Sequence, residues 1–301
     1  MDILNFGSLN IDYVYTVDHI VGAGETIASR TLESFAGGKG LNQSIALARA
    51  GASVHHAGMV GADGEDLVDL LAENGVDVSS IQRVETRTGH AIIQLAAGGQ
   101  NSIVLYGGAN RCLSKAYIDD TLSRFDENTM VLLQNETNLC DYIIEQAHQR
   151  GMRVAMNPAP YDEAVARCDL SKVSVLILNE VEGAQISGGQ APDEVLDTLR
   201  ARYPDTMIML TLGRDGAVFS CRGETHRHGI YEVPVVDTTG AGDTFTGYFL
   251  AALLRDEPYG EAVRLASVAS SLAVTEKGAA NAIPTLARVR NAGLSPMNQS
   301  D

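Results

Sequence analysis

Short apolar runs alternate with helical segments along most of this chain, and this alternation limits the possible folds more than any other feature. A first strand is expected at residues 3–10 and a helix at 40–50. Further strand-like runs lie at 54–59, 130–134, 153–157, 173–178 and 207–212, and helical patterns at 64–74, 140–150 and 180–187. Because parallel strands need a crossover that is usually helical, the pattern predicts an α/β fold. We expect a mainly parallel sheet with helices on both faces.

Two stretches break this alternation and predict a second, smaller sheet. Residues 13–35 contain strand-like pieces at 13–17 and 26–32 with no helix between them. Residues 89–107 read as a hairpin that turns on a pair of glycines. Together they predict a small projecting β-sheet that acts as a lid over a site. We expect residues 1–292 to form one domain, and residues 293–301 to be a disordered tail.

Charge and cysteine usage limit the partners of the chain. Its 301 residues carry a formal net charge of −16, which argues against nucleic acid or an anionic membrane as a partner. Cys112, Cys140, Cys168 and Cys221 lie far apart, as is typical of free thiols in a reducing compartment. No apolar run approaches the roughly 18 residues that span a bilayer, and the N-terminus lacks a basic leader. We therefore expect a soluble, cytoplasmic protein.

A glycine turn near the C-terminal end predicts an anion site. A β-branched run at 231–236, expected as a strand, leads into Asp-Thr-Thr-Gly-Ala-Gly-Asp-Thr-Phe at 237–245, and a buried helix is expected from 244 to 254. A helix that starts at such a turn presents unpaired N–H groups and the positive end of its dipole. The carboxylate of Asp243 would repel a bound anion, but it could accept a proton from a hydroxyl while the N–H groups hold a phosphoryl group. This arrangement favours kinase chemistry.

A second glycine cluster, Ala-Gly-Gly-Lys-Gly-Leu-Asn-Gln at 36–43, lies before the first helix. It lacks the spacing of a Walker A loop, because Gly40 follows Lys39 where that motif has Ser or Thr. The later turn also fails as a dinucleotide fingerprint, since Phe245 stands where a third glycine is required. At the end of the first strand, Asn10 and Asp12 lie two residues apart. They therefore share a face and offer a donor and acceptors to a diol.

Considered together, these segments resemble the ribokinase-like (PfkB) carbohydrate kinases, in order and in spacing, from about residue 3 to residue 285. Within the family, the phrases at 36–43, 155–160 and 274–279 are most similar to ribokinases. The resemblance implies an ATP-dependent kinase that acts on the primary hydroxyl of D-ribose or of a close pentose or hexose. The matching elements are Asn10-Ile-Asp12, the glycine cluster, Asn179-x-x-Glu182, Thr211-x-Gly213 with Gly216, and residues 237–245.

The resemblance also implies a role for each matching residue. Asp243 is the general base, beside an anion hole made by the N–H groups of Gly240, Ala241 and Gly242. Binding of the sugar is implied for Asn10, Asp12, Gly38, Lys39, Asn42, Glu136 and Asp243. Binding of ATP is implied for Asn179, Thr211, Gly213, Gly216 and Gly242, and Glu182 is expected to hold Mg²⁺ through water.

Ribokinases also hold a monovalent cation, usually K⁺, beside the anion hole, and they pair as homodimers through the lid. The cation site would be formed here by Asp237, Thr239, Ala273, Glu276 and Gly278. The chain departs from the family pattern at Ala282, where ribokinases commonly place a hydroxyl residue. The expected K⁺ site is therefore one ligand short. The exposed edges of the lid strands suggest a homodimer here as well.

Other functions remain open on the sequence. A nucleoside kinase would need aromatic side chains over a base, and Tyr13, Tyr15 and Phe35 lie in or beside the lid segments. A kinase for sugar phosphates would need extra cations near the lid, where Arg30 and Arg87 are the evident candidates. A non-catalytic sugar-binding module would have no use for Asp243 or for the Asn179/Glu182 pair.

Overall fold

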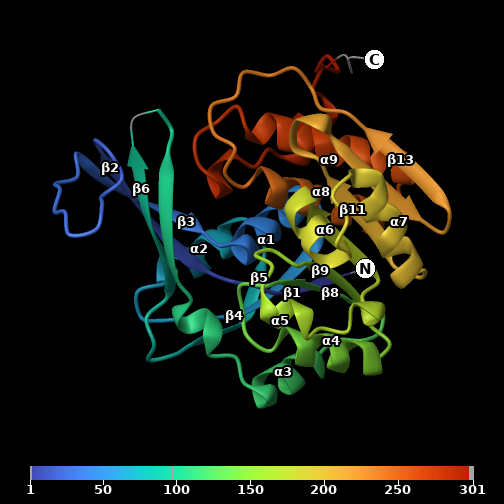
Figure 1. Ribbon diagram of the computed structural model, residues 1–301. Coiled ribbons are helices and arrows are strands. Elements are labelled where there is room, and N and C mark those ends of the chain that lie inside the picture. Colours follow the sequence, from blue (N-terminus) through green and yellow to red (C-terminus); the bar gives the residue numbers. More distant parts are fainter. Residues whose placement is uncertain (1, 97, 298–301) are drawn as a thin grey trace.

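The protein is described by a computed structural model that covers residues 2–96 and 98–297, and its main body is built on one large sheet (Figure 1). Within these ranges that sheet has nine strands in the order β13-β12-β11-β10-β9-β8-β1-β4-β5, and only β12 runs antiparallel to its neighbours. The predicted α/β fold with a mainly parallel sheet is confirmed. The strands are β1 (Asp2–Phe6), β4 (Ser53–Val60), β5 (Asp77–Arg83), β8 (Met130–Gln134), β9 (Arg153–Asn157), β10 (Val175–Asn179), β11 (Met207–Thr211), β12 (Ala217–Cys221) and β13 (Glu224–His228).

Helices cover both faces of this sheet and enclose two apolar cores. One core contains Ile3 and the other contains Leu4, because successive side chains of a strand point to opposite faces. The first core is covered by α1 (Lys39–Arg49), α2 (Glu65–Glu73), α8 (Ala241–Leu254) and α9 (Tyr259–Ala273). The second is covered by α3 (Lys115–Leu122), α4 (Cys140–Gln149), α5 (Glu163–Ala166) and α7 (Pro192–Arg202). The remaining α-helices of the described ranges are α6 (Glu180–Ser187) and α10 (Leu286–Arg290). None of these helices, all from the described ranges, combines enough length with enough apolar character to cross a lipid bilayer.

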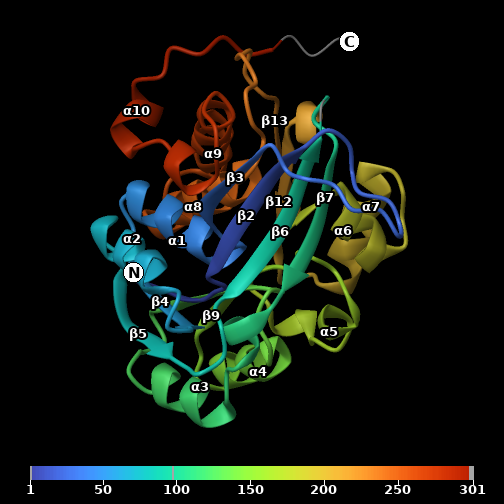
Figure 2. The ribbon, with the colours of Figure 1, turned by 90° about the vertical axis from the view of Figure 1, so that its left-hand side faces the viewer.

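The predicted small sheet is present: it projects from one side of the main body in Figure 1 and faces the viewer in Figure 2. Its order is β3-β2-β6-β7, with β2 (Asn10–Val17), β3 (Thr31–Gly37), β6 (Gly89–Ala96) and β7 (Asn101–Tyr106). The expected first strand at 3–10 is divided in two, because the chain turns after Phe6 and enters the lid at Asn10. Helix α1 packs against this turn: a Cβ on Gly40 would lie 2.2 Å from the backbone nitrogen of Ser8. Only glycine allows that approach.

The predicted strand at 231–236 is wrong. The described part of this segment contains only an isolated bridge between Tyr231 and Pro296. Pro234 has no N–H to give to a sheet, and the N–H groups of Val236 and Asp237 donate to the carbonyl of Val274 instead. The glycine turn at 240–242 is therefore entered from an extended loop and not from a strand.

The C-terminal segment follows the body of the protein further than expected. Of the tail predicted at 293–301, residues 298–301 lie outside the described residues. Before that point the carbonyl of Ser295 accepts from Glu232 at 3.1 Å, and the N–H of Met297 donates to Ile230 at 2.9 Å. The paired part of the chain thus extends to Met297, past the expected boundary at 292.

Candidate active site

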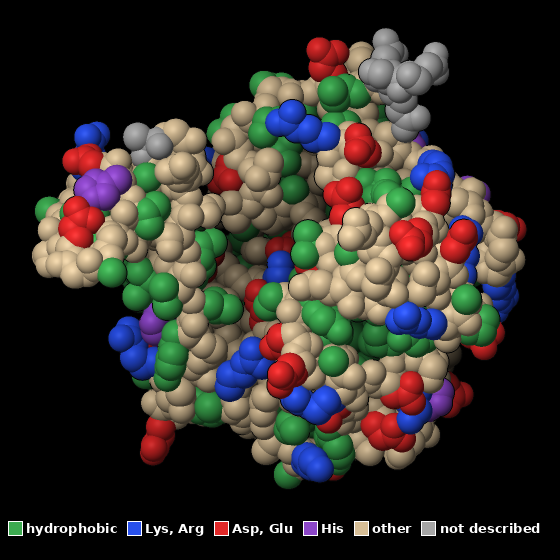
Figure 3. Space-filling view, in the orientation of Figure 1, with side chains coloured by type: hydrophobic (Ala, Val, Ile, Leu, Met, Phe, Trp, Pro, Cys, Tyr) green, Lys and Arg blue, Asp and Glu red, His purple; other side chains and the backbone are tan. Residues whose placement is uncertain are grey.

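The predicted site residues gather at the carboxyl ends of the central strands. Strand β1 lies between β4 and β8 in the sheet. After β1 the chain therefore adds strands first on one side of it and later on the other side. Ligands of open α/β sheets bind at such a switch point. Glu136 follows β8, while Asn179 and Thr211 end β10 and β11. In Figure 3 the surface is deeply hollowed between the lid and the main body, and acidic and basic side chains lie on the floor of the hollow.

The N-terminus of α8 opens into this hollow. Gly240 precedes the helix in the left-handed conformation, with φ 73°, and its carbonyl accepts from Thr244 at 2.8 Å. The N–H groups of Gly242 and Asp243 lie in the first turn, where an α-helix offers no carbonyl to receive them. A Cβ on Gly242 would meet no atom within 4 Å, so there is space for a ligand. Of the three N–H groups predicted as an anion hole, that of Ala241 donates to the carbonyl of Thr238 at 3.2 Å.

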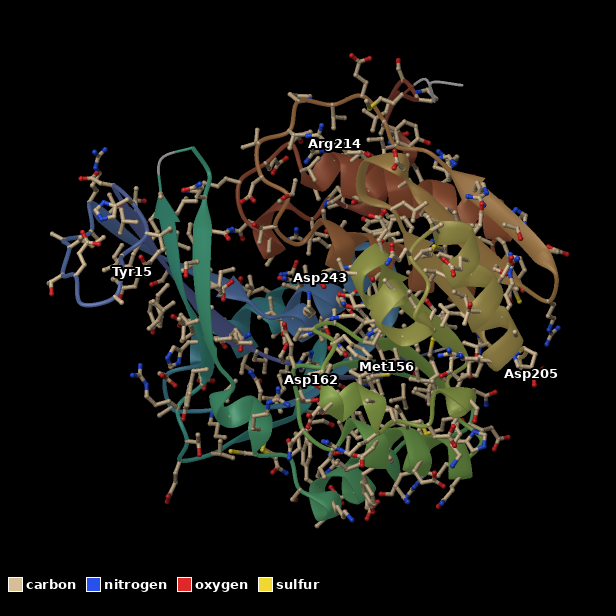
Figure 4. All side chains as sticks on the ribbon, in the orientation of Figure 1. Tyr15, Met156, Asp162, Asp205, Arg214 and Asp243 are labelled. Atoms are coloured by element: carbon tan, nitrogen blue, oxygen red, sulfur yellow. The ribbon has the colours of Figure 1, made fainter. Side chains whose placement is uncertain are left out.

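The carboxylate of Asp243 is held by two amide side chains. Its Oδ2 accepts from Asn42 Nδ2 at 3.0 Å and its Oδ1 accepts from Gln43 Nε2 at 2.9 Å. The side chain is 7% exposed and lies at the centre of Figure 4, between the lid and the helices of the main body. The Oδ1 atom of Asn42 is buried and has no hydrogen-bond partner among the described residues. It is therefore an acceptor available to a ligand.

A cavity of about 240 Å³ adjoins the start of α8. The carboxylates of Asp243, Glu136 and Glu182 raise the pKa of the Lys39 ammonium, although burial opposes them. A fixed positive charge thus stands among three negative ones. Of the predicted residues, the cavity lining includes Lys39, Asn179, Glu182, Thr211, Gly240, Gly242 and Asp243. Gly213 and Gly216 lie in the turn after β11 and do not line it.

Asn179 and Glu182 form a capping box at the start of α6. The side chain of Asn179 accepts from the N–H of Glu182 at 3.0 Å, and the carboxylate of Glu182 accepts from the N–H of Asn179 at 2.8 Å. The box stabilises the helix and fixes the Glu182 carboxylate at the wall of the cavity. No group of three His, Cys, Asp or Glu side chains in the described ranges is arranged to hold a metal ion. A divalent ion beside Glu182 would need oxygens from water and from a ligand.

A second cavity, of about 340 Å³, lies under the lid and is lined by Asn10, Glu136 and Asn110 among others. Asn10 Oδ1 accepts from Asn110 Nδ2 at 2.7 Å, so Asn10 Nδ2 is left to donate. Glu136 Oε2 accepts from Ser8 Oγ at 2.5 Å and from the N–H of Lys39 at 2.9 Å. Lys39 therefore contacts a residue of this cavity with its backbone and lines the other cavity with its side chain. Sequence reasoning missed Ser8 and Asn110, which carry no local motif.

The two faces of the lid differ in chemistry. Asp12 of β2 lies opposite Phe35 of β3. The side chains of Asp12, Phe35 and Asn10 all lie on the same face of the lid. Burial and the nearby Glu136 raise the pKa of Asp12 to about 6. Tyr13 and Tyr15 point to the opposite face, and Figure 4 shows Tyr15 on the side of the lid away from Asp243. Of the three aromatic residues that suggested a nucleoside, only Phe35 shares the face of Asp12.

The residues expected to bind a monovalent cation come from two neighbouring loops. Asp237 Oδ1 accepts from the N–H of Thr239 at 2.9 Å, and Asp237 Oδ2 accepts from the N–H of Gly278 at 2.9 Å. The carbonyl of Ala273 accepts from the N–H of Glu276 at 3.2 Å, while the Glu276 carboxylate pairs with Arg288. Because its carboxylate is paired with Arg288, Glu276 would offer a cation its backbone carbonyl. Ala282 is buried in this region without a hydroxyl to offer.

Comparison with known proteins identifies the family. The signature described as "pfkB family carbohydrate kinase" matches residues 2–286. The chain belongs to this family. The carbohydrate kinase is 35% identical over 288 residues to the ribokinase of Haemophilus influenzae, covering 93% of this chain and 94% of that protein.

Two solved structures extend the likeness to three dimensions. The ribokinase of Cryptococcus neoformans var. grubii in complex with ADP matches this kinase with a TM-score of 0.84 and 33% identity, over 96% of this chain and 98% of that one. The Arabidopsis thaliana ribokinase complexed with ribose and ATP matches with a TM-score of 0.84 and 28% identity, over 96% and 97%. The family resemblance seen in the sequence is confirmed, and the kinase performs ribokinase-like phosphorylation of a sugar.

Proposed function

We propose that this kinase transfers the terminal phosphoryl group of ATP to the primary hydroxyl of D-ribose. The observation that carries the proposal is the position of Asp243, at the start of α8 and at the wall of the 240 Å³ cavity. We assign that cavity to the nucleotide, and the cavity lined by Asn10 and Glu136 to the sugar. Lys39 lies between them, since it lines the first cavity and its N–H donates to Glu136 of the second. Solved relatives in complex with ADP and with ribose and ATP support a sugar and a nucleotide as the two substrates.

The reaction follows from these positions. Asp243 accepts the proton of the ribose hydroxyl, the hydroxyl oxygen bonds to the terminal phosphorus, and the bond from that phosphorus to the ADP oxygen breaks. The N–H groups of Gly242 and Asp243 and the ammonium of Lys39 neutralise charge on the phosphoryl oxygens. The unpartnered Asn42 Oδ1 accepts a second hydroxyl of the sugar, together with contacts from Asp12 and Gly38.

The remaining predicted residues serve the nucleotide and its ions. Asn179, Thr211, Gly213 and Gly216 contact ATP, and Glu182 holds Mg²⁺ through water. Mg²⁺ supplies further charge neutralisation at the phosphates. The loops of Asp237 and Gly278 hold K⁺ with Thr239 and the carbonyls of Ala273 and Glu276. Without a hydroxyl at Ala282, water completes that site.

One panel experiment tests this function. D-ribose, 2-deoxy-D-ribose, hexoses and nucleosides are assayed with ATP and Mg²⁺ by coupled release of ADP, with and without K⁺. We expect D-ribose to give the highest kcat/KM. Phosphorylation of a nucleoside but of no sugar would contradict the proposal. Equal rates with and without K⁺ would contradict the proposed K⁺ site.

The raised pKa of Asp12 predicts a pH dependence of sugar binding. As the pH falls through about 6, the carboxylate becomes protonated and loses its charge-assisted hydrogen bonds to the sugar, so the KM for ribose rises. We expect kcat at saturating ribose to change much less over this range. In Asp12→Asn the KM should be about ten-fold higher and should not vary with pH. Steady-state kinetics from about pH 5 to about pH 8 measure both quantities, and equal wild-type KM values below and above pH 6 would refute the prediction.

The outer face of the lid supports a homodimer. Register places Leu32, Ile92, Val104 and Tyr106 on the face opposite Asp12, and they are 53%, 41%, 63% and 48% exposed. A second copy of this chain would cover these side chains. We expect Val104→Asp to give a monomer in sedimentation velocity, because it would bury a charge in the interface. Ile103→Asp is the matched control, since Ile103 is 56% exposed on the other face and should leave the dimer intact. A monomeric wild-type protein in the same measurement would contradict the proposed homodimer.

We place the reaction in the cytoplasm and assign it no nucleic-acid or membrane partner. Cys112, Cys140, Cys168 and Cys221 are free thiols, which fits a reducing compartment. The net charge of −16 opposes binding to polyanions.

A further inference from the structure

A group of buried amide side chains lies next to Asp243, and the reaction above gives it no role, although one member, Asn157, lines the 240 Å³ cavity. We call Asn5, Gln43, Gln134 and Asn157 the amide chain. Three of them come from the adjacent strands β1, β8 and β9, and Gln43 comes from α1. Asn5 and Gln43 are fully buried, Gln134 is 1% exposed and Asn157 is 9% exposed. Buried amides at the centre of a sheet are costly unless their hydrogen bonds are made.

The amide chain makes directional contacts that end on Asp243. Gln43 Nε2 donates to Asp243 Oδ1 at 2.9 Å and to Asn157 Oδ1 at 3.1 Å. Gln43 Oε1 accepts from Gln134 Nε2 at 2.8 Å, and the same Nε2 donates to Asn5 Oδ1 at 3.0 Å. Every contact pairs a donor with an acceptor, so the amides constrain one another.

Both ends of the amide chain are anchored on backbone carbonyls. Asn157 Nδ2 donates to the carbonyl of Ile177 at 2.9 Å, and Asn5 Nδ2 donates to that of Gly40 at 2.9 Å. A carbonyl can only accept, so the two terminal amides have a single orientation. If Gln43 turned over, its oxygen would face the oxygens of Asp243 and Asn157. The fixed ends therefore direct the NH₂ group of Gln43 toward Asp243.

The far end of the network carries no charge near neutral pH. Asn5 Nδ2 also donates to Ser44 Oγ at 2.8 Å, and Ser44 Oγ lies 2.8 Å from His56 Nδ1. His56 Nε2 lies 3.2 Å from the carbonyl of Gly7, to which it donates. Burial lowers the pKa of His56 to about 4, so the ring is neutral. The only ionised side chain in direct contact with the amide chain, among the described residues, is Asp243.

We propose that Gln43 is a positioning residue for the general base: its amide, oriented by the rest of the amide chain, holds the Asp243 carboxylate in the place and orientation from which it meets the sugar hydroxyl. The Gln43 side chain is fully buried, and among the described residues its hydrogen bonds go to Asp243, Asn157 and Gln134, so it acts through Asp243. This inference rests on the proposed function, in which Asp243 takes the proton of the sugar hydroxyl. The other donor to Asp243, Asn42, also faces the sugar, so the two amides are separable by experiment.

Gln43→Met tests the role, because it removes the amide and keeps most of the side-chain volume. Loss of the donor that fixes the Asp243 carboxylate should lower kcat at saturating ribose by about ten-fold. The KM for ribose at about pH 8 should change less than about three-fold, since Gln43 does not touch the sugar. An unchanged kcat, or a KM for ribose that rises as much as kcat falls, would overturn the proposal.

Gln134→Met supplies a second test that leaves Gln43 in place. It removes the donor that orients Gln43 Oε1, and we expect a smaller loss of kcat, again with the KM for ribose nearly unchanged. This variant decides the question if Gln43→Met does not fold, and an unchanged kcat would then refute the proposal. Thr121→Val in α3 is the control, since it removes a fully buried hydroxyl outside the amide chain and should not change kcat. An inactive wild-type enzyme in the sugar panel would instead refute the proposed function.

Discussion

Asp243→Asn is expected to lower kcat by at least ~10²-fold while binding of D-ribose is largely kept. The amide has nearly the shape of the carboxylate but cannot accept the proton of the attacking hydroxyl. Asn42 and Gln43 both donate to Asp243 in the structure. In the variant, the new NH₂ group would face one of these donors, and that hydrogen bond would be lost. We therefore expect a modest loss of thermal stability in addition to the loss of turnover.

Three measurements separate these effects. Coupled release of ADP gives kcat, calorimetry without ATP gives the affinity for ribose, and thermal melting gives stability. Thr244→Val is the matched control, because Thr244 is the next residue of α8, fully buried, and its hydroxyl has no partner among the described residues. It should keep normal turnover. Near-normal turnover of Asp243→Asn would remove Asp243 from the role of general base.

The central strands were predictable because their signal is local. Strands β8 and β9 were placed at their observed bounds, since each is a short apolar run between turns and is almost wholly buried. The run at 231–236 has a similar composition, but Pro234 interrupts its hydrogen bonding, and Val235 and Val236 are each 62% exposed. Strand β13, with the sequence Glu-Thr-His-Arg-His, was missed because it lies at the edge of the sheet, where burial imposes no apolar pattern.

The candidate site was predictable only where glycine motifs mark it. Lys39, Asn42 and Asp243 stand in or beside such turns. Ser8 and Asn110 carry no motif, and their roles arise only when the lid and β1 bring them against Glu136 and Asn10. The orientation of the amide chain is likewise a tertiary property, because it requires β1, β8 and β9 to lie side by side.

Lys39→Met is expected to lower kcat/KM for ribose by ~10²- to ~10³-fold, similar to the loss of an oxyanion donor in other enzymes. The change removes the cation on the phosphoryl path and leaves Asp243, Glu136 and Glu182 without its compensating charge. Unlike Asp243→Asn, it should also raise the KM for ATP, because the phosphates would then approach uncompensated carboxylates. Lys39→Arg, which keeps the charge, should lose less than Lys39→Met in the same coupled assay.

The double variant Lys39→Met/Asp243→Asn distinguishes a shared transition state from two separate steps. If both side chains act on one phosphoryl transfer, the combined loss of kcat/KM will be smaller than the product of the two single losses. Removing the Asp243 carboxylate also removes one of the negative charges that Lys39→Met leaves uncompensated, so the KM for ATP should fall back toward the wild-type value. A fully multiplicative loss with no recovery of the ATP KM would show that the two residues act independently. The sugar and nucleotide cavities would then not be coupled through Lys39.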